Sequence, residues 1–417
     1  MITINIIGGL GNQLFQIFTL ISTAIDTKQA FYFENITRSS REDRPFYWES
    51  FLSRISIFLK VHVLIHGIFR EPFFHYIDIT KLNYKKEMNI KFIGYYQSYK
   101  YFDKNKRFIS KMIQVQEQRL ALKKKPFVNS LDFQNTVSLH FRIGDYANLQ
   151  HHHPVMSIDY YKNAIKKLIK DTNKEDWNIL YFYEKQDGDE VNKKVQSINS
   201  LFKNLTFVPI DHNLEDWEQM LCMSLCSHNI IANSTFSWWG AYLNDNNNLV
   251  YYPHIWFGKA QGKRNLSDLS LPHWKKVFEL EADNIYCLHY LLPGNKLLEN
   301  KIFKEYYDSI QGKKHITDSN HLLIKIEDSI HYKILSKEFD FDLYELYINE
   351  TKQKEHSTST YKNLIEDFDI SKINNIEIHN IHHDGVKYNV IKDGLHRMSI
   401  IKFNQIEHEY QSHIKMM

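Results

Sequence analysis

The segment His-Phe-Arg-Ile-Gly-Asp-Tyr at residues 140–146 brings an imidazole, a guanidinium and a carboxylate to the end of a run typical of a buried strand. Side chains alternate along a strand, so His140 and Arg142 share one face of it. A guanidinium is a permanent, forked cation that suits a phosphate group, and ligands of open α/β sheets lie beyond the carboxyl ends of the strands. Arg142 therefore either binds an anion or forms a structural ion pair with Asp145.

A glycine-rich turn, Gly-Gly-Leu-Gly-Asn at residues 8–12, separates a β-branched run from an apolar helical run. Glycines at such a turn permit positive φ angles and close approach of the backbone, while the N–H groups of the helix N-terminus attract anions. The turn lacks the Lys-Ser/Thr pair of a phosphate-binding P-loop. Gly11 and Asn12 are thus candidates for contact with a phosphate, and a plain tight turn is the alternative.

A third polar turn, Asn-Ser-Thr-Phe-Ser-Trp-Trp-Gly at residues 233–240, opens a predicted helix. Ser234 or Thr235 is the expected N-cap, and the same hydroxyl and N–H groups could hold a phosphate. Trp238 and Trp239 follow on the helix. They are predicted to pack in the core rather than to form a platform for sugars.

The C-terminal part of the chain has one comparable signal. Residues 376–391 indicate a β-hairpin around an Asp-Gly turn, and Lys-Asp-Gly-Leu-His-Arg at 392–397 leads into an apolar helix. This turn resembles the DG-x-HR turn of ParB-like and sulfiredoxin-like domains, which implies a phosphate or nucleotide site at Asp393, His396 and Arg397. A structural corner between the hairpin and the helix is the alternative.

Alternating strands and helices must position the first three of these turns. The predicted strands are 2–7, 90–97, 136–142, 177–184, 230–233 and 249–253, and the predicted helices are 13–27, 160–170, 216–227 and 235–244. The alternation predicts a parallel sheet covered by helices on both faces. Near residue 285 the composition shifts toward Lys, Glu, His, Asp and Ile. The expected fold is therefore α/β, with domains at 1–130 and 131–289 and an appended α+β domain at 290–417.

Composition excludes several classes of protein. A chain of 417 residues and 50.0 kDa, with 43% hydrophobic and 24% charged residues, is typical of a globular protein with more than one domain. A net charge of +3 does not indicate a nucleic-acid partner, and three cysteines cannot build a disulfide framework or a four-thiolate zinc site. The sequence shows no apolar stretch of about 20 residues and no signal-peptide pattern, so a cytoplasmic location is expected.

Four motifs, in this order, resemble those of α-1,2-fucosyltransferases of glycosyltransferase family 11: GGLGNQLFQ at 8–16, GYYQSYKYF at 94–102, HFRIGDY at 140–146 and NSTFSWWGAYL at 233–243. The resemblance covers about residues 1–260 and implies a GT-B-like pair of Rossmann-type domains. It also implies inverting, metal-independent transfer of L-fucose from GDP-L-fucose, without a cofactor, to the 2-OH of galactose. The family's motif often reads His-x-Arg-Arg-Gly-Asp, whereas here Ile143 stands at the second basic position.

The chemistry that the resemblance implies assigns a role to each polar turn. The bond broken joins the fucose anomeric carbon to a diphosphate, so negative charge grows on the leaving oxygen. Arg142, helped by the helix start, is expected to stabilise that charge. Asp145 and His140 are candidates for accepting the proton of the acceptor hydroxyl. The expected donor-binding residues are Gly11, Asn12, Arg142, Asn233, Ser234, Thr235 and Phe236.

A catalytically inactive glycan- or GDP-sugar-binding protein on the same scaffold is the alternative, and Ile143 is the feature that favours it. The histidines at 151–153 are consecutive and cannot converge on one ion, and those at 379–383 fall within a predicted strand, so no metal site is expected. The expected partners are GDP-L-fucose and a glycan or glycoconjugate acceptor, without nucleic acid and without a membrane span. Loops around 34–60 and 94–102 are expected to select the acceptor.

Overall fold

The structure of the protein, a computed structural model, describes residues 1–35, 44–61, 63–82, 88–246, 248–262, 264–278, 285–290, 299, 301–311, 321–350, 358–366, 376–383, 386–393, 395–403 and 414–416. The chain divides into two compact units, Met1–Glu279 and Leu280–Met417. This division falls earlier than the boundary inferred from composition at residue 290. A boundary at 290 would cut a strand, because β12 extends from Ile285 to Tyr290.

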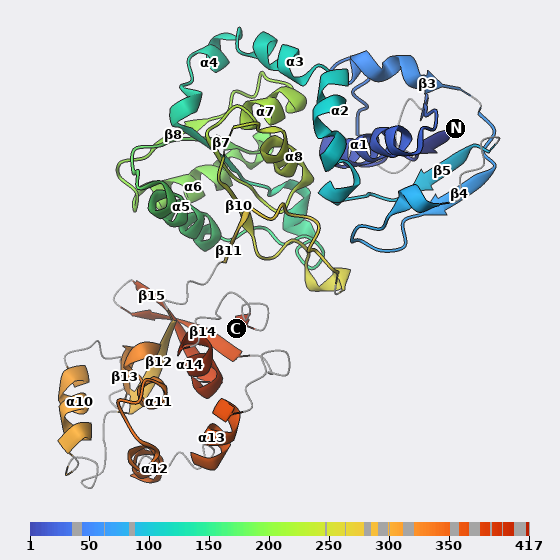
Figure 1. Cartoon of the computed structure of the whole chain (residues 1–417). Coiled ribbons are helices and arrows are strands. Elements are labelled where there is room, and N and C mark those ends of the chain that lie inside the picture. The colour runs from blue at the N-terminus through green and yellow to red at the C-terminus, as the bar shows by residue number, and fades with distance from the viewer. Residues whose placement is uncertain are drawn as a thin grey trace. The chain divides into compact units, whose positions relative to one another are not determined.

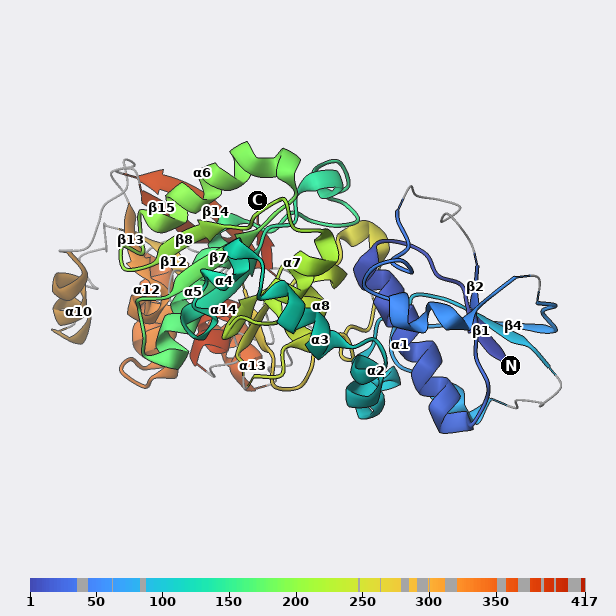
Figure 2. The ribbon, with the colours of Figure 1, turned by 90° about the horizontal axis from the view of Figure 1, so that it is seen from above.

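A small parallel sheet and one long helix open the first unit (Figure 1). The three strands pair in parallel in the order β1-β5-β4, and β2 pairs in parallel with β3. The strands are β1 (Ile2–Ile4), β2 (Phe33–Glu34), β3 (Leu59–Lys60), β4 (Gly67–Arg70) and β5 (Ile90–Ile93). Helix α1 (Leu10–Thr27) follows β1, is buried along most of its length and lies beside these strands (Figure 2).

A six-stranded parallel sheet forms the rest of the first unit, as the alternating pattern predicts. The strand order is β11-β10-β9-β6-β7-β8, and every hydrogen-bonded pair runs parallel. The strands are β6 (Thr136–His140), β7 (Asn178–Phe182), β8 (Thr206–Pro209), β9 (His228–Ile230), β10 (Val250–Pro253) and β11 (Lys275–Val277). The helices are α2 (Lys106–Met112), α3 (Val115–Leu122), α4 (Pro126–Asn129), α5 (Ile158–Thr172), α6 (Gly188–Asn199), α7 (Asp216–Met223) and α8 (Thr235–Leu243).

Strand β7 shows that both faces of this sheet are covered. Ile179 and Tyr181 belong to a hydrophobic core that includes side chains of α5 and α6. Leu180 and Phe182 belong to the core on the opposite face, which includes side chains of α7 and α8. Burial on two faces is typical of a parallel sheet between layers of helices. The α/β class and the pair of parallel α/β layers predicted for residues before 290 are therefore confirmed.

The helices α1 and α8 join the two parallel sheets through aromatic packing. The ring centroids of Phe15 and Trp238 lie 4.4 Å apart, and those of Phe18 and Trp239 lie 4.5 Å apart. Both tryptophans are fully buried, which confirms their predicted place in the core. Large buried aromatic rings contribute strongly to a core, so this contact fixes α1 and α8 against each other.

The second unit contains a mixed five-stranded sheet with helices. Its strand order is β13-β12-β15-β14-β16, and the predicted hairpin is confirmed, because β14 pairs with β15 in antiparallel fashion. The strands are β12 (Ile285–Tyr290), β13 (His321–Lys325), β14 (Ile376–His383), β15 (Val386–Asp393) and β16 (Ile414–Met416). The helices are α10 (Lys301–Gln311), α11 (Ile330–Leu335), α12 (Phe341–Glu350), α13 (Thr358–Glu366) and α14 (Leu395–Phe403).

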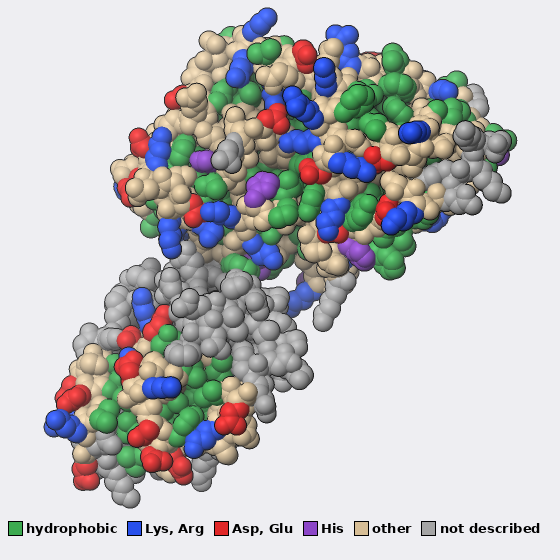
Figure 3. Space-filling model, viewed as in Figure 1, with side chains coloured by type: hydrophobic (Ala, Val, Ile, Leu, Met, Phe, Trp, Pro, Cys, Tyr) green, Lys and Arg blue, Asp and Glu red, His purple; other side chains and the backbone are tan. Residues whose placement is uncertain are grey.

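On the face shown in Figure 3, basic and acidic side chains are interspersed over the described surface of the first unit. Mixed charge of this kind fits the small net charge of +3 and gives no extended field of one sign on that face. Within the described parts of the chain, no helix combines the length and the apolar character that a membrane crossing requires.

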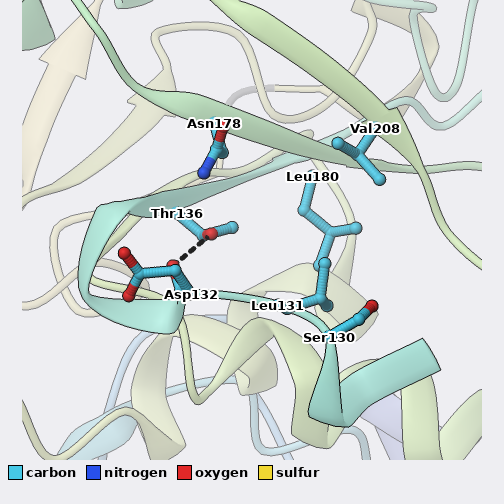
Figure 4. A pocket seen from close by; sticks show the side chains of 7 residues that line it. All are labelled: Ser130, Leu131, Asp132, Thr136, Asn178, Leu180 and Val208. Carbon is cyan, nitrogen blue, oxygen red and sulfur yellow. Dashed lines mark hydrogen bonds between the residues drawn. The ribbon is translucent and has the colours of Figure 1, made fainter. Parts of the chain in front are cut away.

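A small cavity of about 120 Å³ lies at the amino ends of the strands of the six-stranded sheet (Figure 4). Thr136 and Asn178 are the first residues of β6 and β7, and both line this cavity. The Thr136 hydroxyl donates to the Asp132 carbonyl oxygen over 2.6 Å. Ligands of parallel α/β sheets lie at the opposite, carboxyl edge, which carries the motif of residues 140–146.

Candidate active site

Arg142 stands just beyond the carboxyl end of β6 and is held by two carboxylates. Its Nη1 pairs with Oε1 of Glu184, and its Nη2 pairs with Oδ1 of Asp145. The guanidinium carbon also lies 4.9 Å from the ring centroid of Tyr146. The ion pair with Asp145 that the sequence left open is thus present. It leaves further N–H groups of the guanidinium available, because such a group carries several donors.

Glu184 is the partner that the sequence motifs missed. Strands β6 and β7 pair in parallel with His140 opposite Phe182, so continuing this register by two residues brings Arg142 opposite Glu184. Glu184 lies just beyond the carboxyl end of β7, and a polar residue at that place is the signal that could have identified it. The signal can be used only once the strand order of the sheet shows that β7 is the neighbour of β6.

The loop between Arg142 and Asp145 depends on a glycine. Gly144 has a φ of +33°, and a Cβ there would lie 2.8 Å from Oε2 of Glu184. The N–H of Gly144 donates to the Asp187 carboxylate over 2.9 Å. The positive φ of Gly144 disfavours any residue with a side chain, and a Cβ there would also displace the Glu184 carboxylate that pairs with Arg142.

His140 is buried at the end of β6, with 6% of its surface exposed. Its ring centroid lies 5.6 Å from that of Phe236, and no described group hydrogen-bonds to its Nδ1. Burial, together with the charge of Arg142, lowers the pKa of His140 to about 3. An imidazole with this pKa is neutral near pH 7 and is a weak proton acceptor.

The turn that begins α8 combines a helix cap with tightly anchored polar groups. Ser234 is the N-cap, and its hydroxyl accepts from the N–H of Phe236 over 3.3 Å, so the cap predicted from the sequence is confirmed. The side-chain amide of Asn233 donates to the carbonyl oxygens of Pro154 and Trp256. Asn233 thereby holds two neighbouring loops, and its Oδ1 is buried without a hydrogen-bond partner among the described residues.

Tyr146 connects this turn to Arg142. Its hydroxyl donates to the carbonyl oxygen of Asn233 over 3.3 Å, while its ring lies against the guanidinium of Arg142. The ring of Tyr146 also stacks on His153, with centroids 4.8 Å apart. His153 therefore contributes to an aromatic stack.

The glycine-rich turn at the start of α1 packs directly against the start of α8. A Cβ at Gly11 would lie 2.7 Å from the nitrogen of Phe236 and closer still to the carbonyl of Thr235. Gly8, with a φ of +81°, precedes the N-cap Gly9. Close backbone contact between the two turns is therefore possible only because position 11 lacks a side chain.

Asn12 contacts the second of the four motifs, at residues 94–102. Its Oδ1 accepts from Nε2 of Gln97 over 2.8 Å, and Gln97 belongs to the segment 94–102. Gln16 also bridges these motifs, because it accepts from the N–H of Ile7 and donates to the carbonyl oxygen of Gly94. Side-chain amides of the motif at 8–16 therefore hold the motif at 94–102 in place.

Two helix N-termini thus meet in one place. Neither α1, with 18 residues, nor α8, with 9 residues, has an acidic side chain in its first turn. The partial positive charge of each terminus is consequently not neutralised within its own helix. Two such termini near a guanidinium form an arrangement that favours an anion.

The corresponding turn of the second unit is differently built. The Nε2 of His396 is paired with the hydroxyl of Tyr344, and its ring centroid lies 4.4 Å from Tyr361 and 4.5 Å from His331. His396 is therefore part of an aromatic cluster. The side chain of Asp393 lies outside the described residues, and Arg397 at the start of α14 is half-buried.

The described residues contain no group of three or more His, Cys, Asp or Glu side chains that could hold a metal ion. Cys222 and Cys226 are buried free thiols, and burial raises the pKa of Cys222 to about 12. Thiols in this state are protonated and are poor metal ligands.

Comparison with known proteins provides independent information about the chain. The profile of "Glycosyl transferase family 11" matches residues 1–277. The O-antigen biosynthesis glycosyltransferase WbnK of Escherichia coli is 31% identical over 48% of this chain and 65% of its own length. An α-1,2-colitosyltransferase of the same organism is 31% identical over 43% and 61%. This chain therefore spans somewhat less than two thirds of the length of these two relatives.

A galactoside 2-α-L-fucosyltransferase of Caenorhabditis elegans is 28% identical over 66% of this chain and 79% of its own length. Among solved structures, the fucosyltransferase NodZ from Bradyrhizobium is 12% identical, with a TM-score of 0.34 over 57% of this chain and 92% of that chain. The family profile covers the greater part of the sequence and all four motifs. The chain belongs to glycosyl transferase family 11.

Proposed function

We propose that this protein transfers L-fucose from GDP-L-fucose to a glycan hydroxyl, the 2-OH of a galactose, with inversion to an α-1,2 linkage. Membership of the family and the similarity to a galactoside 2-α-L-fucosyltransferase support this reaction class. The observation that carries the proposal is the meeting of the α1 and α8 N-termini beside the loop of Arg142. A nucleoside diphosphate is the kind of anion that such a place favours.

In this proposal Arg142 stabilises the charge that develops on the departing diphosphate. Its fork is oriented in advance by Glu184 and Asp145, so the remaining donors need no reorganisation when charge appears. Preorganised donors of this kind supply much of the rate enhancement in group transfer. We also propose that the backbone N–H groups of Gly11 and Thr235, which lie in helix starts packed against each other, contact the same diphosphate.

Asp145 is the proposed acceptor of the proton from the sugar hydroxyl. About half of its side chain is exposed, so an acceptor can reach it. His140 is the weaker candidate, because burial keeps its imidazole neutral and poorly basic. As the glycosidic bond forms, the hydroxyl proton passes to the Asp145 carboxylate, and the C–O bond to the diphosphate breaks with its electron pair leaving on GDP.

A colitosyl donor is the second candidate, since one relative is named an α-1,2-colitosyltransferase. Purified protein should be incubated with a galactose-terminated acceptor and either GDP-L-fucose or GDP-colitose, with and without EDTA. The proposal predicts an α-1,2-linked fucoside, identified by NMR of the product, formed at a similar rate with EDTA. A strict requirement for Mg²⁺ or Mn²⁺ would contradict the charge-stabilising scheme.

The outcome also separates the enzyme from an inactive binding protein. GDP binding without any release of GDP in the presence of acceptors would favour the inactive alternative. A product formed only from GDP-colitose would replace the proposed donor. A protein that binds no GDP would contradict both the enzyme and the GDP-sugar-binding alternative.

A further inference from the structure

Asp145 receives guanidinium groups from two directions. One of its carboxylate oxygens pairs with Arg142, and the other lies 4.0 Å from Nη2 of Arg44. Arg44 lies between β2 and β3, in the part of the unit that contains the small parallel sheet. A single carboxylate therefore brings together permanent cations from the two sheet-bearing parts of the first unit.

The residues next to Arg44 are anchored on two sides. The carbonyl oxygen of Pro45 accepts from Nε2 of Gln13 over 2.9 Å, and the same amide also holds the glycine-rich turn. The hydroxyl of Tyr47 donates to Asp216 at the start of α7. Both Gln13 and Tyr47 are buried. These two contacts fix the segment that carries Arg44 between the glycine-rich turn and the carboxyl edge of the six-stranded sheet.

Residue 143, where the family often has a second arginine, is an isoleucine and brings no charge to Asp145. Ile143 is 4% exposed and belongs to the hydrophobic core that includes α5 and α6. The motif itself therefore contributes one guanidinium, whereas the folded chain presents a second one from Arg44 at the same carboxylate.

We propose that Arg44 is a second donor-binding residue, whose guanidinium contacts the diphosphate of the nucleotide-sugar together with Arg142. The inference rests on the proposed function, because it concerns the leaving group of that reaction. A diphosphate carries more negative charge than one carboxylate and offers more acceptor oxygens to two forked cations. Asp145 can then release Arg44 to the diphosphate and accept a proton.

If Arg44 served only as a structural partner of Asp145, a different result would be expected. The side chains of Arg44 and Asp145 are 44% and 48% exposed. Exposed ion pairs contribute little to folding stability. If the pair only braced the loop, its removal would leave GDP affinity unchanged.

The test is the affinity for GDP, measured by calorimetry, of the full chain and five variants. Arg44→Ala should weaken GDP binding by about 10-fold, as expected for the loss of a charge-assisted hydrogen bond. Arg44→Lys keeps the charge without the fork and should lose less. Arg54→Ala, an exposed arginine of the same part of the unit, is the matched control and should bind as the wild type does. Asp145→Asn, alone and combined with Arg44→Ala, tests whether Arg44 acts through Asp145.

The inference predicts that Arg44→Ala still weakens GDP binding when Asp145 is already Asn. It is overturned if Arg44→Ala binds GDP as well as Arg54→Ala does, or if its effect disappears in the Asp145→Asn background. These failures differ from failure of the proposed function, in which the wild-type protein itself binds no GDP. Melting temperatures of the wild type and of the Arg44 and Arg54 single variants should agree within about 2 °C, since the pair of Arg44 and Asp145 is exposed.

Discussion

Two helix starts in this protein have the sequence pattern of an anion site, and their surroundings differ. At the start of α8, the turn packs against a second helix N-terminus, and the loop that carries Arg142 is hydrogen-bonded to it through Tyr146. At the start of α14, His396 is paired with the Tyr344 hydroxyl and packed among aromatic rings. At the first place two helix starts pack against each other beside the loop of Arg142, whereas at the second the imidazole of His396 is packed among aromatic rings.

From this difference we infer that an anion site needs more than a glycine and a basic residue before a helix. The α8 start is supported by a guanidinium that two carboxylates orient and by a second helix whose first turn has no acid. At the start of α14, the side chain of His396 packs against the rings of His331 and Tyr361. We expect the first unit to carry the reaction and the α14 turn to act as a structural corner.

The largest expected effect comes from Arg142→Ala. Loss of a preorganised charge-stabilising donor typically costs on the order of 10²–10³ in rate, so fucosyl transfer should fall by about that factor. Arg397→Ala, which removes the arginine in the first turn of α14, should leave the rate unchanged. Initial rates of GDP release at saturating acceptor measure both variants. Equal losses in the two variants would remove the distinction between the two helix starts.

The second effect is a steric one at the contact of α1 and α8. Gly11→Ala would place a Cβ against the carbonyl of Thr235, and overpacking of this kind costs about 1–3 kcal/mol. Gly9→Ala adds a Cβ with no heavy atom within 4 Å and is the matched control. Urea denaturation should show lower stability only for Gly11→Ala, with weakened GDP binding in the folded fraction. A Gly11→Ala protein with wild-type stability and affinity would show that the two turns need not touch.

The third effect is a pH dependence that arises from His140. Its pKa is about 3 in the folded chain, below the usual 6.5 of an unfolded histidine, so the unfolded chain binds the extra proton first. The stabilisation is complete above about pH 6.5 and is lost as the pH falls toward 3. Lowering the pH from 7 to about 5.5 should therefore cost about 1 kcal/mol in His140 alone. Wild type and His140→Gln should differ by this amount in urea denaturation at the two pH values, and parallel losses would refute the assignment.

The smallest effect concerns the cap of α8. Ser234→Ala removes the hydroxyl that accepts from the N–H of Phe236, and the loss of an N-cap typically costs about 1 kcal/mol. The double change Ser234→Ala with Thr235→Ala should leave the first unit folded while weakening GDP binding. Unchanged GDP affinity in the folded double variant would mean that these hydroxyls serve the helix alone.

Local features of this fold could be predicted from the sequence because they depend on near neighbours. The strand–turn–helix order of the first unit, the Ser234 cap and the burial of Trp238 and Trp239 all follow from short-range patterns. The first strand was predicted to reach Ile7, yet it ends at Ile4. The N–H of Ile7 donates to the side chain of Gln16 instead, a contact that no local pattern reveals.

The residues that the sequence missed are all brought in by tertiary structure. Glu184 reaches Arg142 only because β7 is the sheet neighbour of β6. Arg44 reaches Asp145 because Gln13 and Tyr47 anchor its loop from two directions. Such partners depend on strand order and long-range contacts, which residue spacing within a motif does not contain.

Hydrogen exchange of the full chain with and without GDP tests the central claim most directly, because it reports on backbone N–H groups. The account predicts that GDP slows exchange in peptides covering residues 8–16 and 233–243, where the two helix starts meet, and leaves residues 395–403 of α14 unchanged. Protection confined to 395–403, or absent from both segments of the first unit while GDP is bound, would contradict it.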